Sequence, residues 1–77
     1  MDEKINRLFA EVLQIPAGTI TDDLKMKDVD VWDSLKHMEL IVSLEQAFDV
    51  QLSFDEIVVM QSVQEIKRVL KSRTVSN

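Results

Sequence analysis

The apolar residues of this chain recur at helical spacing, and one glycine and one proline interrupt its 77 residues. Five apolar residues at positions i, i+3, i+4, i+7 and i+8 predict the buried face of a first helix. They are Ile5, Leu8, Phe9, Val12 and Leu13. This helix is expected to end near Gln14, because Pro16 disfavours helical backbone at the residue before it.

A long connection over residues 16–33 separates this helix from a second one, expected over residues 34–48. Loops of that length in small domains usually carry a function or contain a helical turn. We therefore expect an ordered loop that lies across helix ends. The apolar residues expected to pin it to the domain are Ile20, Leu24, Val29, Val31 and Trp32.

The second predicted helix carries two sets of apolar residues. The core face is expected to comprise Leu40, Ile41, Leu44, Ala47 and Phe48. A second set, which we call the outer stripe, comprises Leu35, Met38 and Val42. At about 100° per residue, the outer stripe lies roughly 60–120° around the helix from the core face. It therefore either stays exposed as a docking surface or packs, through Met38 and Val42, against the 16–33 loop.

Two shorter helices follow, each opened by a Ser-x-x-Glu capping box, at Ser53–Glu56 and Ser62–Glu65. The last helix is expected to bury Val63, Ile66, Val69 and Leu70. Residues 73–77 are expected to form a frayed tail. The sequence thus predicts one all-α domain over residues 1–77, with its core within residues 3–71. It is a small four-helix bundle of three main helices and a short third helix, with a long first loop.

Composition narrows the function. The absence of cysteine excludes a disulfide framework and a thiolate metal site. The net charge of −5 argues against a nucleic-acid partner, and the best candidate recognition helix carries Glu39, Glu45 and Asp49 against Lys36. The acidic excess suits a basic partner surface, or it serves solubility alone. The charged N-terminal segment is unlike a signal peptide and no apolar run reaches membrane-spanning length, so we expect a cytoplasmic monomer without membrane insertion.

Ser34 and His37 raise the question of catalysis, because side chains three residues apart share one face of a helix. A serine nucleophile also needs an orienting acid, an oxyanion hole and a pocket. A bundle of this size leaves little room for them. We therefore interpret His37 as a surface histidine and do not expect an enzyme.

The acidic loop raises the question of calcium. Counting Asp28 as position 1 of an EF-hand loop places Asp30 at position 3 and Glu39 at position 12, as required. Trp32 then occupies position 5, and Asp33 stands where the turn requires glycine. A solvated acidic loop without a metal is the better interpretation.

Ser34 opens the second predicted helix. A serine at such a position is usually an N-cap. Asp33 is better placed for that role, which would leave the Ser34 hydroxyl free at the first turn. The start of a helix presents unpaired N–H groups and positive potential, and both favour an attached phosphate. The outer stripe beside it can then serve as a docking surface.

The motif DSL, Asp33 to Leu35, resembles the attachment motif of the acyl carrier protein family. The surrounding register strengthens the likeness: an amphipathic helix, a long loop, DSL opening the second helix, and a short third helix before a fourth. HMEL and SLEQAFDV are similar to segments of the family's second helix, and SFDEI and SVQEI resemble the starts of its last two helices. The similarity covers roughly residues 3–71.

The resemblance implies that a phosphopantetheinyl transferase attaches 4′-phosphopantetheine, taken from coenzyme A, to Ser34. The arm would hold acyl cargo as a thioester, so the chain would be a phosphoprotein carrier that presents cargo to acyl-loading and acyl-transferring enzymes. Asp33 would cap the helix and help position the transferase. The residues that the resemblance assigns to partner docking are Leu35, Lys36, His37, Met38, Glu39, Val42 and Glu45.

Three residues depart from the family's fatty-acid carriers. Trp32 precedes the motif in place of a small residue, and Lys36 and His37 follow it where acidic and small residues are usual. This pattern is similar to specialised stand-alone carriers and to carrier modules of polyketide or nonribosomal peptide systems, and predicts a dedicated biosynthetic pathway. A general carrier of fatty acid biosynthesis and lipid metabolism, or a peptidyl or D-alanyl carrier, stays open. A function of a different class is the alternative to a covalent carrier: a module that binds a partner non-covalently through the outer stripe.

Overall fold

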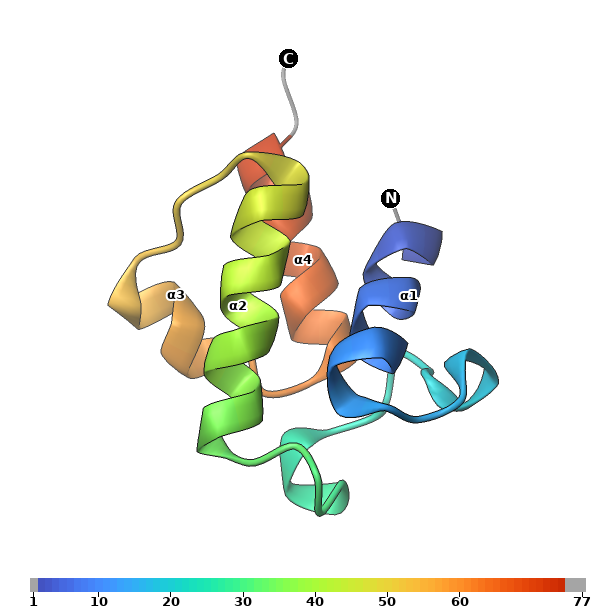
Figure 1. Cartoon of the computed structure of the whole chain (residues 1–77). Helices are drawn as coiled ribbons and strands as arrows, with labels where there is room; N and C mark the ends of the chain where they lie inside the picture. Colours follow the sequence, from blue (N-terminus) through green and yellow to red (C-terminus); the bar gives the residue numbers. More distant parts are fainter. Residues whose placement is uncertain (1, 75–77) are drawn as a thin grey trace.

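The computed structural model describes residues 2–74 as a bundle of helices with α2 at its centre (Figure 1). The elements are α1 (Asp2–Leu13), the 3-10 turns η1 (Ala17–Thr19) and η2 (Met26–Asp28), α2 (Ser34–Phe48), α3 (Phe54–Val59) and α4 (Val63–Thr74). In Figure 1, α2 runs between α3 on one side and α1 on the other, with α4 behind it. The described residues contain four α-helices and no strand, so the predicted all-α fold is confirmed.

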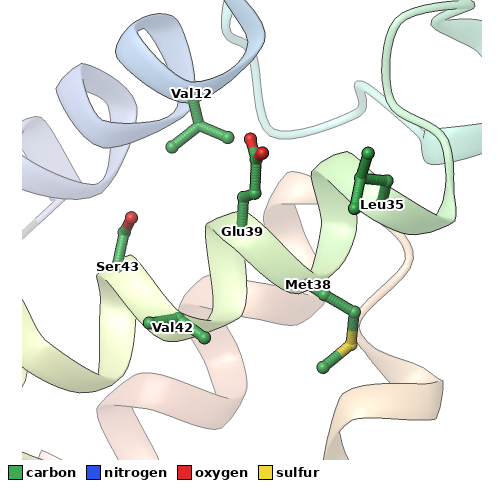
Figure 2. A pocket seen from close by; sticks show the side chains of 6 residues that line it. All are labelled: Val12, Leu35, Met38, Glu39, Val42 and Ser43. Carbon is green, nitrogen blue, oxygen red and sulfur yellow. The ribbon is translucent and has the colours of Figure 1, made fainter.

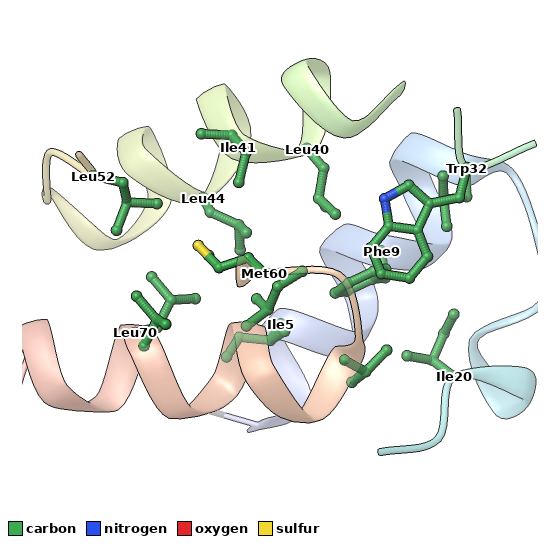
Figure 3. Packing of buried hydrophobic residues seen from close by; sticks show 14 residues of the cluster. Ile5, Phe9, Ile20, Trp32, Leu40, Ile41, Leu44, Leu52, Met60 and Leu70 are labelled. Carbon is green, nitrogen blue, oxygen red and sulfur yellow. The ribbon is translucent and has the colours of Figure 1, made fainter. Parts of the chain in front are cut away.

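The core lies where α1, α2 and α4 face one another (Figure 3). The predicted core residues that are buried are Ile5, Phe9, Leu13, Leu40, Ile41, Leu44, Val63, Ile66, Val69 and Leu70. Those that are half-buried at its margin are Leu8, Val12, Ala47 and Phe48. Helical periodicity therefore identified the inward face of each long helix correctly.

The two longest connections begin at helix ends that close without glycine. Gln14 follows α1 with a φ of 57°, and the N–H of Ile15 donates to the carbonyl of Ala10 at 3.2 Å. This is a Schellman closure, and α2 ends in the same way with Asp49 at a φ of 54°. The predicted end of the first helix near Gln14 is confirmed. Gly18, by contrast, lies inside η1 and closes neither helix.

The 16–33 loop contains the turns η1 and η2, and four of its five predicted anchors contact the core. Ile20 and Trp32 are buried, and Leu24 and Val29 are half-buried against the core cluster. The expectation that Val31 also pins the loop is wrong, because its side chain is exposed. Its position explains the difference: the N–H of Trp32 donates to the carbonyl of Val29 at 3.0 Å, which places Val31 at the corner of a tight turn.

The loop is also joined by backbone hydrogen bonds to the segment that opens α4. The N–H of Met26 donates to the carbonyl of Gln61 at 2.9 Å, and the N–H of Val63 donates to the carbonyl of Leu24 at 3.0 Å. These bonds fix the loop across the start of α4, so the expectation of an ordered loop lying across helix ends is confirmed.

Both predicted capping serines act as caps. Ser53 forms the complete box with Glu56: its hydroxyl accepts from the Glu56 N–H, and the Glu56 carboxylate accepts from the Ser53 N–H. The Ser62 hydroxyl accepts from the N–H of Glu65 at 3.1 Å. The carboxylate of Glu65 accepts from Arg68 on the next turn of α4. The local signals in the sequence thus located both helix starts correctly.

The expectation of a frayed tail from residue 73 is wrong for residues 73 and 74, because α4 extends to Thr74. Arg73 donates twice to the carboxylate of Glu56, each time at 2.7 Å, and so ties the end of α4 to α3. These bonds, with that from the Ser53 N–H, lower the pKa of Glu56 from 4.5 to about 2. Residues 75–77 lie outside the described part of the chain. Among residues 2–74, no helix is long and apolar enough to span a membrane.

Candidate functional site

The start of α2 is capped by Asp33. Its backbone is extended, with φ −94° and ψ −173°, and its Oδ1 accepts from the N–H of Lys36 at 2.9 Å. Its carbonyl accepts from the N–H of His37 at 2.8 Å. Asp33 thus satisfies the donors of the first turn in the manner of an N-cap, as its position in the sequence indicated.

Ser34 is the first residue of α2, and its side chain is exposed. Because Asp33 accepts the capping bond, the Ser34 hydroxyl does not serve as the cap, and residues 2–74 offer it no hydrogen-bond partner. Helix geometry leaves the N–H groups of Ser34 and Leu35 without an intrahelical acceptor. The site therefore combines an accessible nucleophilic oxygen with a local environment that stabilises an anion.

The outer stripe is exposed beside Ser34. Leu35 retains 69% of its accessible surface, Met38 49% and Val42 47%. The alternative that Met38 and Val42 pack against the 16–33 loop is therefore wrong.

The outer stripe forms one side of an open groove of about 510 Å³ between α1 and α2 (Figure 2). Leu35 lies at the end of the groove next to Ser34, and Val12 of α1 faces Glu39 and Ser43 across the gap. The lining residues are Val12, Leu35, Met38, Glu39, Val42 and Ser43. An apolar groove thus begins next to Ser34 and continues along α2.

Comparison with known proteins identifies the family of the chain. A protein-family model described as a phosphopantetheine attachment site matches residues 3–70. The chain belongs to the acyl carrier protein family. The family's covalent cofactor is phosphopantetheine, and its members are carriers rather than enzymes.

Three curated relatives show the range of carriers to which the chain is similar. Polyketide-8 synthase acyl carrier protein 2 of Streptomyces avermitilis is 36% identical over 72 residues, which cover 92% of this chain and 82% of that protein. An acyl carrier protein of Onion yellows phytoplasma is 36% identical over 64 residues, covering 83% and 84%. One of Desulforapulum autotrophicum is 30% identical over 81 aligned positions, covering 96% and 97%.

His37 is not the surface residue that we expected of this carrier. Its side chain is only 7% exposed, and the indole N–H of Trp32 donates to its Nδ1 at 3.0 Å. Its Nε2 lies 3.2 Å from the carbonyl of Ile57, so the hydrogen bonds assign the proton to Nε2. With both ring nitrogens occupied, His37 neither activates Ser34 nor offers itself to a docking partner.

This buried pair connects the loop before Ser34 to α3. Trp32 also packs edge-on against Phe9, with ring centroids 5.0 Å apart. The sequence did hold a signal for the burial of His37, because the residue precedes Leu40 by three positions and Leu44 by seven. This spacing extends the core face of α2 by one turn toward the site.

The three charged residues predicted for docking make two kinds of contact. Lys36 Nζ contacts Glu39 Oε1 at 3.3 Å, so the acidic border of the outer stripe is partly neutralised. Glu45, which the resemblance also assigns to docking, makes a contact within the fold. Its carboxylate accepts from the N–H of Leu52 at 2.9 Å, which holds the connection between α2 and α3.

Sequence reasoning missed an exposed apolar surface on α3. Phe54 retains 77% of its accessible surface, and Val58 and Val59 are also exposed. The signal was present, because a six-residue helix with apolar residues all around cannot bury every one of them.

The acidic 16–33 loop shows no arrangement for a cation. Within residues 2–74, no three His, Asp or Glu side chains come together in a group that could hold a metal ion. Asp28 closes η2, and Asp30 precedes the turn corner at Val31. The apolar anchors of the loop hold it against the core.

Proposed function

We propose that Ser34 carries the 4′-phosphopantetheine arm. The observation that carries the proposal is its exposed hydroxyl, free of hydrogen-bond partners within residues 2–74, at the start of a helix that Asp33 already caps. The N–H groups of the first turn favour the phosphodiester that attachment to Ser34 would leave. Once bound, the arm supplies a thiol that holds cargo as a thioester, a group that this cysteine-free chain cannot supply itself.

Intact-mass spectrometry tests this proposal directly. After incubation with coenzyme A and a broad-specificity transferase, the protein should gain one phosphopantetheine, and Ser34→Ala should gain none. Ser43→Ala, at a half-buried serine of the same helix, is the matched control and should load normally. Loading of Ser34→Ala would contradict the proposal. Unmodified protein that still binds its partner and functions in cells would favour a non-covalent interaction module.

We infer that the transferase and the cargo-handling enzymes contact the outer stripe, with Asp33 helping to position the transferase. The stripe is exposed, apolar and adjacent to Ser34, as a docking surface must be. Leu35 is its most exposed member, and Phe54 on α3 is a larger apolar residue of similar exposure for comparison. Interface anchors typically contribute more than 1 kcal/mol. Leu35→Ala should therefore lower the kcat/KM of loading by at least fivefold while Phe54→Ala changes it less, and equal effects would contradict this docking site.

We further propose that the carrier serves a dedicated biosynthetic pathway, such as polyketide assembly. The similarity to a polyketide synthase carrier and the cation at Lys36 beside the outer stripe support this. The other two relatives are named only as acyl carrier proteins, so general fatty-acid synthesis is the second candidate, and an amino-acid carrier is the third.

A substitution at Lys36 tests whether the carrier serves a dedicated pathway or general fatty-acid synthesis. If its charge helps to exclude fatty-acid-synthesis enzymes, Lys36→Asp should raise their turnover of the loaded carrier severalfold. Equal or lower turnover would contradict this. His37 is unsuitable for the test, because substituting it would break the buried bond to Trp32.

A further inference from the structure

Methionine supplies all the sulfur of this chain, because its sequence contains four methionines and no cysteine. Within residues 2–74, the three methionines differ in exposure. Met38 retains 49% of its accessible surface, Met26 is half-buried against the core, and Met60 is fully buried. Figure 2 shows the thioether of Met38 projecting away from Val12 and α1. A dissolved oxidant therefore reaches the sulfur of Met38 more readily than the sulfur of the other two.

Met38 occupies the middle of the outer stripe, three positions after Leu35 and four positions before Val42. It also follows Ser34 by four positions, so the two residues are neighbours on the helix surface, about 6 Å apart along its axis. An enzyme that reaches the Ser34 hydroxyl over the stripe therefore covers Met38. A chemical change at this sulfur changes the surface that the enzyme meets.

Oxidation converts the Met38 side chain from an adaptable apolar group into a polar one. With hydrogen peroxide, the sulfur lone pair attacks one oxygen, and the S–O bond forms as the O–O bond breaks. The proton of the transferred oxygen moves to the departing hydroxide, which leaves as water, so the sulfur is oxidised and the peroxide reduced by two electrons. The new oxygen is a hydrogen-bond acceptor, and its stripe neighbours Leu35 and Val42 offer no side-chain donor. Lys36 already donates to Glu39.

The fold does not depend on the Met38 side chain. Leu40, Ile41 and Leu44 form the buried face of α2, and Met38 lies outside the core cluster. Met60 is the contrast, because an oxygen added to its buried sulfur would enter the core. A sulfoxide at Met38 therefore changes the docking surface and leaves the bundle intact. A methionine sulfoxide reductase reverses the change: two thiols form a disulfide, and the sulfoxide oxygen leaves as water.

We propose that Met38 is a site of reversible oxidation by peroxides, and that its sulfoxide slows docking of the transferase; this rests on the proposed docking role of the outer stripe. Reduced Met38 completes a continuous apolar surface with Leu35 and Val42. Oxidised Met38 places an acceptor at its centre, and an enzyme that covers the stripe removes water from that acceptor without replacing its hydrogen bonds.

The test uses the full chain before loading, because the thiol of an attached arm would also consume peroxide. The protein is treated with hydrogen peroxide, the excess is removed with catalase, and peptide mapping by mass spectrometry follows each methionine over time. We expect one added oxygen on Met38 before Met26 or Met60 reacts. The kcat/KM of loading should then fall by about fivefold or more, with the midpoint of thermal unfolding unchanged. Methionine sulfoxide reductases of both stereospecificities, with dithiothreitol, should restore loading.

Substitutions assign the effect to one sulfur. Met38→Leu should load at the same rate before and after peroxide treatment. The matched control Met26→Leu should lose loading on treatment as the original protein does. Met38→Gln, which carries a polar acceptor that cannot be oxidised, should load slowly without any treatment.

The outcomes separate this inference from the proposed function. Oxidation of Met26 or Met60 as fast as Met38 would overturn the site. Unchanged loading of the Met38 sulfoxide, or inhibition that persists in Met38→Leu, would overturn its effect on docking. If the untreated protein gains no phosphopantetheine, the proposed function and the effect on docking are both overturned, while the peptide map still decides whether Met38 oxidises first.

Discussion

The hydrogen bond between Trp32 and His37 should contribute measurably to the stability of the region around Ser34. We consider Trp32→Phe, His37→Leu and the double variant. Trp32→Phe removes the donor to Nδ1, and His37→Leu removes the acceptor of the indole N–H. The carbonyl of Ile57 keeps a second donor, the N–H of Met60 at 3.2 Å, so replacing His37 leaves that carbonyl satisfied.

The magnitude follows from burial. Trp32 is 2% exposed and His37 7%, so each single substitution leaves one buried polar atom without a partner. Such an orphan costs about 1–3 kcal/mol, and Trp32→Phe adds a cavity. In the double variant neither atom is present, so its loss should be smaller than the sum of the two single losses by about 1–2 kcal/mol, within the usual range for contacting residues.

Urea unfolding followed by far-ultraviolet circular dichroism measures all four proteins, because the helical backbone dominates this signal and it remains available in the variants that lack the tryptophan. Gln46→Leu, at an exposed position on α2, is the control and should change the free energy of unfolding by no more than about 0.5 kcal/mol. If the double variant loses as much free energy of unfolding as the two single variants together, to within about 0.5 kcal/mol, the reasoning is refuted. Trp32 and His37 would then lie next to each other without a hydrogen bond that stabilises the fold.

Two further predictions concern the connections around α3. Glu45→Ala should lower the free energy of unfolding by about 1–3 kcal/mol, because it removes the charged acceptor of the Leu52 N–H. Glu45→Gln keeps an acceptor and should lower the free energy of unfolding by less. Equal losses for the two variants in urea unfolding would contradict this role of Glu45. Arg73→Gln should destabilise the protein at neutral pH and not near pH 2. The pKa of Glu56 is about 2 in the folded protein against 4.5 ordinarily, so this stabilisation is complete above pH 4.5 and is lost as the pH falls toward 2. A pH-independent effect of Arg73→Gln would contradict it.

The helices and the exposed serine at the start of α2, Ser34, were predictable because the sequence patterns that indicate them are local. Periodicity located the buried faces of the long helices, and Ser-x-x-Glu marked the starts of α3 and α4. Asp33 and Ser34 stand next to each other, so the sequence alone indicated which one caps α2. Short-range geometry decides each of these features.

The expectation for Val31 failed because of a local turn, but the other main failures involve partners distant in the chain. The burial of His37 depends on the carbonyl of Ile57, twenty positions away, and the order of Arg73 depends on Glu56, seventeen positions away. The groove needs Val12 of α1 to approach α2, which depends on how the two helices cross. A sequence pattern assigns a face to one helix, but it does not say what another helix brings to that face.

Tandem mass spectrometry of the loaded protein tests the central claim most directly, because it locates the modification on the peptide that contains Ser34. The account predicts phosphopantetheine on Ser34 at the start of α2 and on no other serine. Phosphopantetheine on Ser43, Ser53 or Ser62, or its absence after treatment with several transferases, would contradict the account.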